Sequence, residues 1–520
     1  MSPGLGGRAR VAIVGGGPVG MGLALEMGKR GISAVVLEKE DTLHDIPKGQ
    51  NLTQRTMEHF RVWGVESQVR AARVMPPDYP AVGVNAYGDL LSPYSHPWFR
   101  RSSVDPYYFT GNERLPQYRT EAVLRARVAE LWSVSVRQGT PAIDVTQDGS
   151  GVVFTTPEGM IEADYAVGCD GSHSLVRERA GIEEQRSDHD RRMALIVFRS
   201  RELHALLEER FGQASFFNVL HPDLDGYWRF LGRVDVGEQW FFHAPVAPDA
   251  TVETLDCRGL LAAAVGADVE LDLDYVGFWD LRFAVADSYQ MGRIFIAGDA
   301  AHSHPPYGGY GINLGLEDVR NLGWKLGAVI EGWGGQGLLP SYTEERRPVF
   351  VSTAHDFIEA FIENDRAFIN RHDPELDEAD FAEAWEGRRA GSNRAVSEFE
   401  PHYEGSPIVL GDGSPGAVGS HSFEARPGHH LPPAETPDKD ELFEALGTGF
   451  SLVTSDPQSE TVASFEAAAD QLGVPLAVVR AGMSGYATRL ALVRPDHFVS
   501  WVDDGSPCDV RAILSKAVGA

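Results

Sequence analysis

The stretch RVAIVGGGPVG, residues 10–20, decides how the chain begins to fold. It opens with a short apolar run rich in β-branched residues, which is typical of a parallel strand buried on both faces. A GxGxxG pattern follows at once and consists of Gly15, Gly17 and Gly20. Such glycines allow a tight turn and a close approach of the backbone to a pyrophosphate group.

A helix and a second strand are predicted after this turn. Pro18 is tolerated there because the N–H groups of a first helical turn have no partner inside the helix, and residues 21–29 continue as a helix. A second apolar run, residues 33–37, ends in Glu38, 18 residues after Gly20. A helix N-terminus attracts phosphate, and a carboxylate at this spacing binds a ribose hydroxyl. The stretch therefore predicts a Rossmann-type dinucleotide site.

Two further motifs end apolar strands later in the chain. In ADYAVGCDGSHSLVR, residues 163–177, an Asp-Gly pair at Asp170 and Gly171 follows the strand. In RIFIAGDAAH, residues 293–302, a Gly-Asp pair stops another strand. A loop rich in Pro and Gly comes next, and residues 314–326 then have the apolar spacing of a helix.

In this order, the three motifs resemble the FAD site of the single-component (class A) FAD-dependent aromatic hydroxylases, the para-hydroxybenzoate and phenol hydroxylase family. Asp299 matches the family's second ribose-binding acid, and Gln117 matches a residue that reaches the ribityl chain. A helix N-terminus aimed at the flavin would stabilise negative charge on the ring. The resemblance implies FAD contacts from Gly15, Gly17, Pro18, Gly20, Glu38, Gln117, Asp170, Gly171, Gly298, Asp299, Pro306, Gly311, Ile312 and Asn313.

The resemblance implies an α/β protein with a Rossmann-type FAD-binding domain, a mixed β-sheet substrate domain and a C-terminal thioredoxin-like α/β domain. The C-terminal part has apolar runs that predict strands alternating with helices, and it lacks a CxxC pair, which excludes a thiol redox role. The expected boundaries are 1–185 for the first part of the FAD domain, with an inserted substrate-domain segment near 75–110; 186–285 for the β-sheet substrate domain; 286–400 for the second part of the FAD domain and further helices; 401–440 for a linker; and 441–520 for the thioredoxin-like domain.

Aromatic strands between residues 190 and 290 contain three candidates to bind or deprotonate a phenol, namely Tyr227, Arg229 and His243. Side chains alternate across a strand, so Tyr227 and Arg229 are expected on one face, with Trp228 and Phe230 on the other. Either face could meet the substrate at this stage.

The activity that the resemblance implies is an NAD(P)H-dependent aromatic monooxygenase. NADPH or NADH would reduce FAD transiently, O2 would give a flavin C4a-hydroperoxide, and a phenolic or otherwise activated aromatic ring would take up one oxygen atom; the cofactor carries this chemistry and the protein positions it. Baeyer–Villiger insertion, epoxidation or reduction without oxygen transfer are alternatives on the same scaffold. A protein that carries FAD and sequesters its ligand is the alternative outside the enzymes.

Composition limits the classes of partner that the protein is expected to bind. The 520 residues carry a net charge of −29, which argues against nucleic acid and anionic membrane surfaces. The three cysteines are far apart in sequence and fit no zinc spacing, so we predict no metal site. No apolar run reaches the roughly 18 residues of a membrane helix. We expect a cytoplasmic protein, and the family resemblance adds a possible homodimer.

Overall fold

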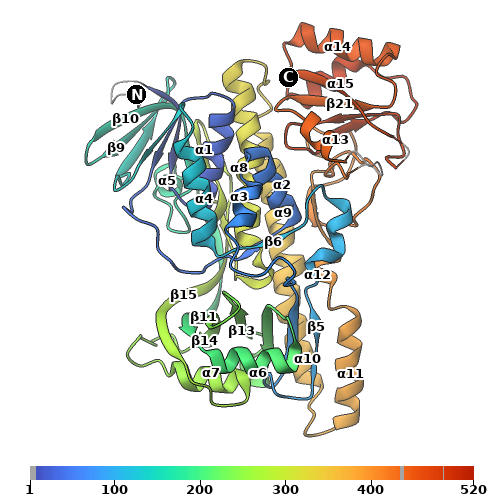
Figure 1. The fold of residues 1–520 in the computed structure, drawn as a ribbon. Helices are drawn as coiled ribbons and strands as arrows, with labels where there is room; N and C mark the ends of the chain where they lie inside the picture. Colours follow the sequence, from blue (N-terminus) through green and yellow to red (C-terminus); the bar gives the residue numbers. More distant parts are fainter. Residues whose placement is uncertain (1–7, 434–438, 484) are drawn as a thin grey trace.

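The amino-terminal apolar run forms a central strand of an eight-stranded sheet, called the first sheet below (Figure 1). A computed structural model describes residues 8–433, 439–483 and 485–520, with side chains for all of these except 188–190 and 439–441. Strand β1 (Ala9–Val14) pairs in parallel with β10 (Gly159–Gly168) and β2 (Ala34–Leu37). The other strands are β17 (Ile294–Ile296), β16 (Gln290–Met291), β7 (Val134–Arg137), β8 (Asp144–Gln147) and β9 (Val152–Thr156).

Helix α1 (Pro18–Lys29) packs on β1 and β2 and against the long buried helix α8 (Tyr310–Glu331). The two helices approach closely because α8 presents glycines to α1. A Cβ atom at Gly323 would stand 2.8 Å from the Cβ of Glu26, so a larger residue has no room there. The remaining helices of this part are α2 (Gln54–Trp63), α3 (Glu66–Ala71), α4 (Gln117–Ala129) and α5 (Leu175–Arg179), and a short ladder joins β3 (Asn51–Leu52) to β6 (Glu113–Arg114).

The second sheet also has eight strands, and they come from three separate parts of the chain. In spatial order they are β18 (His302–Ser303), β15 (Asp272–Ala286), β11 (Glu184–Arg199), β14 (Gln239–Val246), β13 (Trp228–Arg233), β12 (Phe216–Leu220), β4 (Gly83–Tyr87) and β5 (Ser95–Trp98). The segment expected near 75–110 thus supplies β4 and β5 to this sheet.

The two faces of the second sheet meet different neighbours. Its outer face packs on α6 (Arg201–Phe211) and α7 (Cys257–Val265), near the bottom of Figure 1. Its inner face meets the loop that precedes α8, where the rings of Trp228 and Tyr307 lie 4.6 Å apart. The loop residues next to the predicted flavin site therefore cover the inner face.

Residues 341–397 form helices that run past both sheets, namely α9 (Ser341–Ser352), a π-helical segment (Thr353–Glu359), α10 (Ala360–Arg371), α11 (Glu378–Ala390) and α12 (Arg394–Ser397). The linker expected over 401–440 is packed in its described part, 401–433, and residues 434–438 lie outside the described ranges. Strands β19 (Phe399–His402) and β20 (Gly416–Val418) pair there, and Tyr403, Val409 and Leu431 are buried. Its glycines and prolines turn the chain sharply, while its apolar residues bind it to the rest of the molecule.

The C-terminal part forms a four-stranded sheet in the order β22-β21-β23-β24. Its elements are α13 (Lys439–Ala445), β21 (Phe450–Thr454), α14 (Glu460–Leu472), β22 (Leu476–Arg480), β23 (Leu490–Val493), β24 (Val499–Val502) and α15 (Val510–Ala517). Helix α14 connects the parallel pair β21 and β22, as expected. In contrast to the expected alternation, β23 and β24 are joined without a helix, because the turn between them spans only 494–498.

Glu345 of α9 connects the C-terminal sheet to the rest of the molecule. Lys325 of α8 and Ser406 donate hydrogen bonds to its carboxylate at 2.7 and 2.6 Å. Arg494, just after β23, donates to both of its oxygens at 2.6 and 3.0 Å. Although burial raises the pKa of Glu345, Arg494 and Lys325 hold it well below its usual range. Because a buried charge requires a partner, this network determines where the C-terminal sheet docks.

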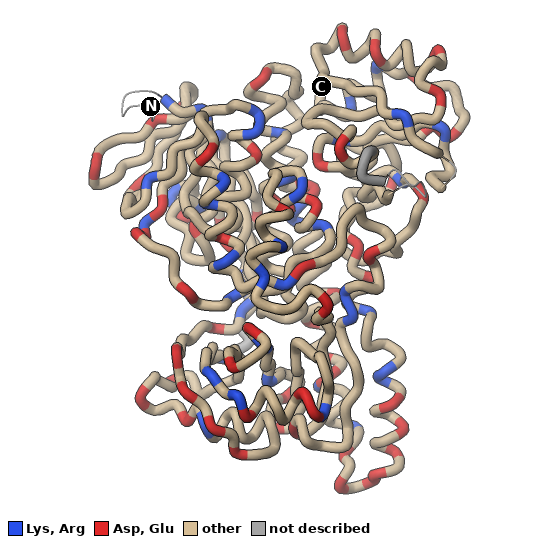
Figure 2. The backbone as a smooth tube through the Cα atoms, viewed as in Figure 1, with Lys and Arg blue, Asp and Glu red and all other residues tan. Residues whose placement is uncertain are grey.

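Charge is spread over the surface. Figure 2 shows Asp and Glu interspersed with Lys and Arg along all parts of the chain trace. Within the described ranges, no helix combines the length and the hydropathy needed to cross a membrane.

We expect Arg494→Met to lower the free energy of unfolding by about 3–5 kcal/mol, because it leaves Asp496 buried without its cation and Glu345 with Lys325 alone. Urea denaturation followed by circular dichroism measures this change. Arg489→Met is the control, since that side chain is 82% exposed and its nearest carboxylate oxygen lies 3.9 Å away; it should stay within about 0.5 kcal/mol. Equal midpoints for the two variants would contradict the docking role.

Candidate active site

Four neighbouring parallel strands of the first sheet end at one level. Leu37 of β2, Val14 of β1, Gly168 of β10 and Ile296 of β17 occupy a single register row. Each predicted cofactor motif begins within two residues of one member of this row, and Glu38 directly follows Leu37. Ligands of open α/β sheets bind at the carboxyl ends of the strands. The topology therefore brings three motifs that are far apart in sequence to one edge.

The first turn contains glycines that the fold needs and one that it does not. Gly15 has φ 101°, and a Cβ there would stand 2.2 Å from the carbonyl oxygen of Cys169. A Cβ at Gly20 would stand 1.9 Å from the carbonyl oxygen of Gly15. At Gly17, the N-cap of α1, a Cβ would meet no described atom within 4 Å. With Pro18 in the first turn, the free N–H groups of α1 open onto space that suits a phosphate.

Glu38 lies beside this turn. Its carboxylate is buried and accepts hydrogen bonds from the backbone N–H groups of Gly16, at 2.5 Å, and Glu40, at 2.8 Å. These bonds hold the carboxylate at the edge of the glycine turn, where the sequence predicts a ribose.

The Asp-Gly motif follows β10, the strand next to β1. Asp170 accepts from the Ser174 hydroxyl at 2.6 Å and from the Val176 N–H at 3.2 Å, so its carboxylate caps α5. Gly171 has φ 81°, and a Cβ there would meet no described atom within 4 Å. The backbone at Gly171 is thus open to a ligand, whereas the Asp170 side chain is engaged with the protein.

The Gly-Asp motif ends β17 and leads toward α8. The N–H of Gly298 donates to the buried carboxylate of Asp318 at 3.0 Å. Asp299 follows with an exposed side chain. It is therefore free to contact a ligand at the same edge as Glu38.

Helix α8 begins directly after the Pro/Gly loop. Two successive glycines, Gly308 with φ 70° and Gly309 with φ 66°, turn the chain from Pro306 into the helix. Gly311 and Ile312 lie in the first turn, whose N–H groups have no helical partner. A Cβ at Gly311 would meet no described atom within 4 Å, so this helix end is also open.

Asn313 and Gln117 border that opening. The Asn313 side chain is engaged with the protein, since its amide donates to the carbonyl oxygen of Gly309 at 2.7 Å and accepts from Thr53 N–H at 2.9 Å. Gln117 accepts from the N–H of Gly49 at 3.2 Å. A Cβ at Gly49 would lie 3.4 Å from both Gln117 and Ile312, so the three residues form one wall.

These observations fit FAD. The open backbone at Gly17 and Gly171 would hold a pyrophosphate, and the carboxylates Glu38 and Asp299 flank it. The open first turn of α8 at Gly311 would face the flavin. The predicted residues thus form two groups, one at the strand ends of the first sheet and one at the N-terminus of α8.

The three substrate candidates are separated by the structure. His243 is on the inner face, with the rings of Phe230 and Trp279 at 6.4 and 6.0 Å. Arg229 points to the outer face, where it donates to the carbonyl oxygen of Ala263 in α7 at 3.2 Å. Tyr227 directly precedes β13, and the guanidinium of Arg191 lies over its ring.

Sequence reasoning missed three polar residues of the inner face, His96, Asn85 and Asn218. Each carries a buried side-chain atom that has no hydrogen-bond partner in the described part of the chain. A polar residue inside an apolar strand, such as Asn218 after Phe216 and Phe217, is a usable signal. Only the sheet shows that the three share a face.

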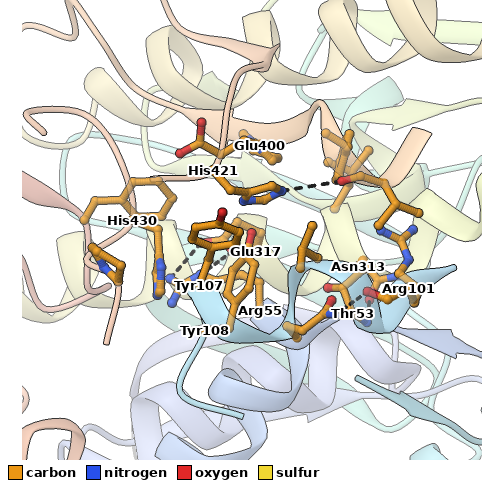
Figure 3. A pocket seen from close by; sticks show the side chains of 18 of the residues that line it. Thr53, Arg55, Arg101, Tyr107, Tyr108, Asn313, Glu317, Glu400, His421 and His430 are labelled. Carbon is orange, nitrogen blue, oxygen red and sulfur yellow. Dashed lines mark hydrogen bonds and ion pairs between the residues drawn. The ribbon is translucent and has the colours of Figure 1, made fainter. Parts of the chain in front are cut away.

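Two cavities lie in this region. One of about 240 Å³ is bordered by the inner face at β4 and β5, by Tyr307 and by α10 and α11. One of about 60 Å³ lies between α2, α8 and the segment 396–432. Figure 3 shows Arg101, Tyr108, Glu400 and His421 around the smaller one. A cavity of about 150 Å³ is known to hold benzene, so the larger cavity has room for an aromatic ring and the smaller does not.

A cluster of possible metal ligands consists of His402, Glu404 and His429. The two nitrogens of His429 already contact carboxylates, Glu400 at 2.9 Å and Glu404 at 2.8 Å. The rings of His402 and His429 stack at 4.9 Å with 17° between their planes. Parallel rings direct their lone pairs along parallel lines, so the described contacts form a hydrogen-bonded network.

Comparisons with known proteins agree with this geometry. Residues 8–356 match the FAD binding domain family, and residues 424–520 match the aromatic-ring hydroxylase C-terminal family. The chain is 30% identical to a 4-methyl-5-nitrocatechol 5-monooxygenase of Burkholderia sp, over 98% of this chain and 97% of that protein. The rebeccamycin biosynthetic enzyme RebC with reduced flavin matches with TM-score 0.84 and 29% identity, over 98% and 99% of the two chains. Aklavinone-11 hydroxylase with FAD and aklavinone matches with TM-score 0.79 and 25% identity, over 99% and 100%.

We expect Gly17→Leu to fold normally but to weaken FAD binding at least about tenfold, or 1.4 kcal/mol, because the new side chain enters the space left for the pyrophosphate. Flavin fluorescence titration of the apoprotein measures the Kd. Gly149→Leu is the matched control, since a Cβ there also meets no described atom within 4 Å but the residue lies in the turn between β8 and β9. Equal FAD affinity in both variants would exclude the turn as the pyrophosphate site.

Burial lowers the pKa of His243 from 6.5 to about 4. The unfolded chain therefore takes up this proton more readily than the native protein, and stability falls as the pH drops from 6.5 toward 4. We expect His243→Phe to reduce the stability lost between pH 7 and pH 5 by roughly 2 kcal/mol. Urea denaturation at the two pH values measures this change. His44→Phe, at an exposed position, should behave like the wild type; the same behaviour in His243→Phe would refute a neutral buried imidazole.

Proposed function

The chain belongs to the FAD-dependent aromatic-ring hydroxylases, and we propose that it adds one oxygen atom from O2 to a phenolic or otherwise activated aromatic ring held against the inner face of the second sheet. The observation that carries the proposal is the row of four strand ends, which brings the open glycine turns at Gly17 and Gly171 to one edge of the sheet with the carboxylates of Glu38 and Asp299. NADPH or NADH is the transient electron donor.

The cofactor-binding residues divide into two groups. Gly17, Glu38 and Asp299 would hold the adenosine and pyrophosphate half, and the first-turn N–H groups of Gly311 and Ile312 would hold the flavin. FAD supplies electron transfer and oxygen activation when bound. The N-terminus of α8 supplies partial positive charge, which stabilises an anionic ligand edge placed against it.

The inner face supplies a largely buried aromatic surface for the substrate. Trp228 and Phe241 are buried there, with Phe230 partly buried beside them. Excluding water from such a site protects reactive intermediates from unproductive decay. An aromatic substrate gains burial against the same side chains.

His243, on β14, is the polar residue of the inner face that we assign to substrate binding. Because burial lowers its pKa to about 4, its imidazole is neutral at pH 7 and is a weak base. We therefore assign it the role of a hydrogen-bond partner that orients a substrate hydroxyl. Arg229 contacts α7 on the outer face, so we assign it no substrate contact. A homodimer and a cytoplasmic location stay predictions.

We expect the FAD-loaded protein to oxidise NADPH or NADH faster when an activated aromatic compound is added in air. The panel consists of phenol, catechol, naphthols and hydroxyanthraquinones, and the product should be one oxygen atom heavier, with label from ¹⁸O2. Product structure by NMR separates ring hydroxylation from Baeyer–Villiger insertion or epoxidation. Gly17→Leu, which should hold less FAD at the same flavin concentration, is the control and should show lower turnover.

Two outcomes would count against hydroxylation. Stimulated nicotinamide oxidation without incorporated ¹⁸O and without hydrogen peroxide would favour a reductase. Ligand binding without any stimulation across the panel, in protein that carries FAD, would favour a sequestering protein.

A further inference from the structure

One level of the second sheet carries a row of side chains across its inner face. Cross-strand partners run from His96 of β5 to Asn85 of β4, then to Asn218, Phe230 and His243 of β12, β13 and β14. Residues directly opposite each other in a sheet project from the same face. We call His96, Asn85, Asn218 and His243 the polar row.

Every member of the polar row has a side-chain atom without a hydrogen-bond partner in the described part of the chain, namely His96 Nε2, Asn85 Oδ1, Asn218 Oδ1 and His243 Nδ1. His96, Asn218 and His243 are only 4, 2 and 7% exposed. Folded proteins pair the great majority of buried polar atoms, because an unpaired one loses its hydration without compensation. Four such atoms in one row indicate that another molecule supplies their partners.

His96 presents an acceptor. Its Nδ1 lies 3.0 Å from the carbonyl oxygen of Pro97. A carbonyl can only accept, so Nδ1 carries the hydrogen and Nε2 presents a lone pair. Burial lowers the pKa of His96, which keeps the ring neutral at pH 7. Asn85 Oδ1, from the opposite residue on β4, is a second acceptor at the same place. Two adjacent acceptors require a donor such as a hydroxyl group.

His96 and Asn85 line the cavity of about 240 Å³. Trp98, Tyr307 and Phe361 are also in its wall, so the space combines aromatic surfaces with the two acceptors. A flat aromatic ring that carries a hydroxyl group matches both features.

The polar row is longer than a single ring. Neighbouring strands lie about 4.8 Å apart, so the four steps from β5 to β14 span about 19 Å. Ile46, beside the wall formed by Gly49 and Gln117, packs near the β14 end. The His96 end therefore lies four strand steps from His243, to which we assign a substrate hydroxyl, and Tyr307 of the loop before α8 borders it. A ligand that reaches toward both ends must contain several fused rings.

Resting on the proposed function, we infer that His96 and Asn85 form a distal subsite that accepts a hydrogen bond from a hydroxyl group on the far ring of a fused polycyclic phenol. The hydroxyl donates its one hydrogen to His96 Nε2, with the Asn85 side chain beside it as the alternative acceptor. A one-ring phenol leaves the subsite unpaired and binds more weakly.

Two probes test the subsite in the FAD-loaded protein. The compounds 2-hydroxyanthraquinone and 2,6-dihydroxyanthraquinone share one phenolic ring and differ by a hydroxyl group on the opposite ring. We expect the dihydroxy probe to bind about tenfold more tightly, measured as a Kd by titration of the flavin absorbance. His96→Leu should reduce this ratio to near one and leave the Kd of the monohydroxy probe unchanged. His96→Gln, whose amide keeps an acceptor, should restore most of the ratio.

Asn85→Leu provides a second variant if His96→Leu fails to fold, as judged by its urea midpoint. Equal wild-type affinity for the two probes, an unchanged ratio in both variants, or no binding of either probe would overturn the subsite. Turnover is measured separately. A tenfold binding ratio without any oxygenated product contradicts the proposed function and supports the subsite. Oxygenation of both probes with equal Kd supports the function and overturns the subsite.

Discussion

Asp318 of α8 has a buried carboxylate that joins three segments of the chain. It accepts hydrogen bonds from the N–H of Gly298 at 3.0 Å and from Arg346 Nε at 2.7 Å, and His302 Nε2 lies 2.7 Å from it. Its side chain is 0% exposed. Although burial raises the pKa of Asp318, His302 and Arg346 hold it below its ordinary value. Removing one partner from such a network leaves a buried charge uncompensated. Asp318 thereby ties the strand-end turn, the loop before α8 and α9 together, which sets the spacing between the two ends of the proposed FAD site.

The two faces of the second sheet differ in how their polar side chains are paired. The outer face packs on α6 and α7, and Arg229 donates there to the carbonyl oxygen of Ala263. The inner face instead combines buried aromatic rings with the unpaired atoms of the polar row. Unpaired buried atoms oppose stability, and proteins keep such conflicts mainly where they serve function. The contrast between the faces is the reason for assigning the substrate to the inner one.

Composition alone does not show whether the segment 401–433 is exposed or buried. Its Gly, Pro and Ser content predicts a linker, yet Tyr403 and Val409 are fully buried and Ser406 donates to Glu345. Residues of this segment also line the cavity in Figure 3, among them His421 and His430. Glycine and proline determine how sharply a chain turns. Whether the turned segment is covered depends on partners elsewhere, here Glu345 and Arg494.

By itself, the sequence determined the local chemistry of this protein. The glycine spacing at residues 15–20, the acid at Glu38 and the strands that end before Asp170 and Gly298 are readable because each feature depends on neighbours in sequence. The family resemblance rests on the same local motifs. Tertiary structure alone decided which residues share the inner face. Cross-strand register brings His96 and Asn85 into one row with His243 and turns Arg229 away. Register is a relation between distant strands, and a shift of one residue would exchange the two faces, so no local pattern specifies it.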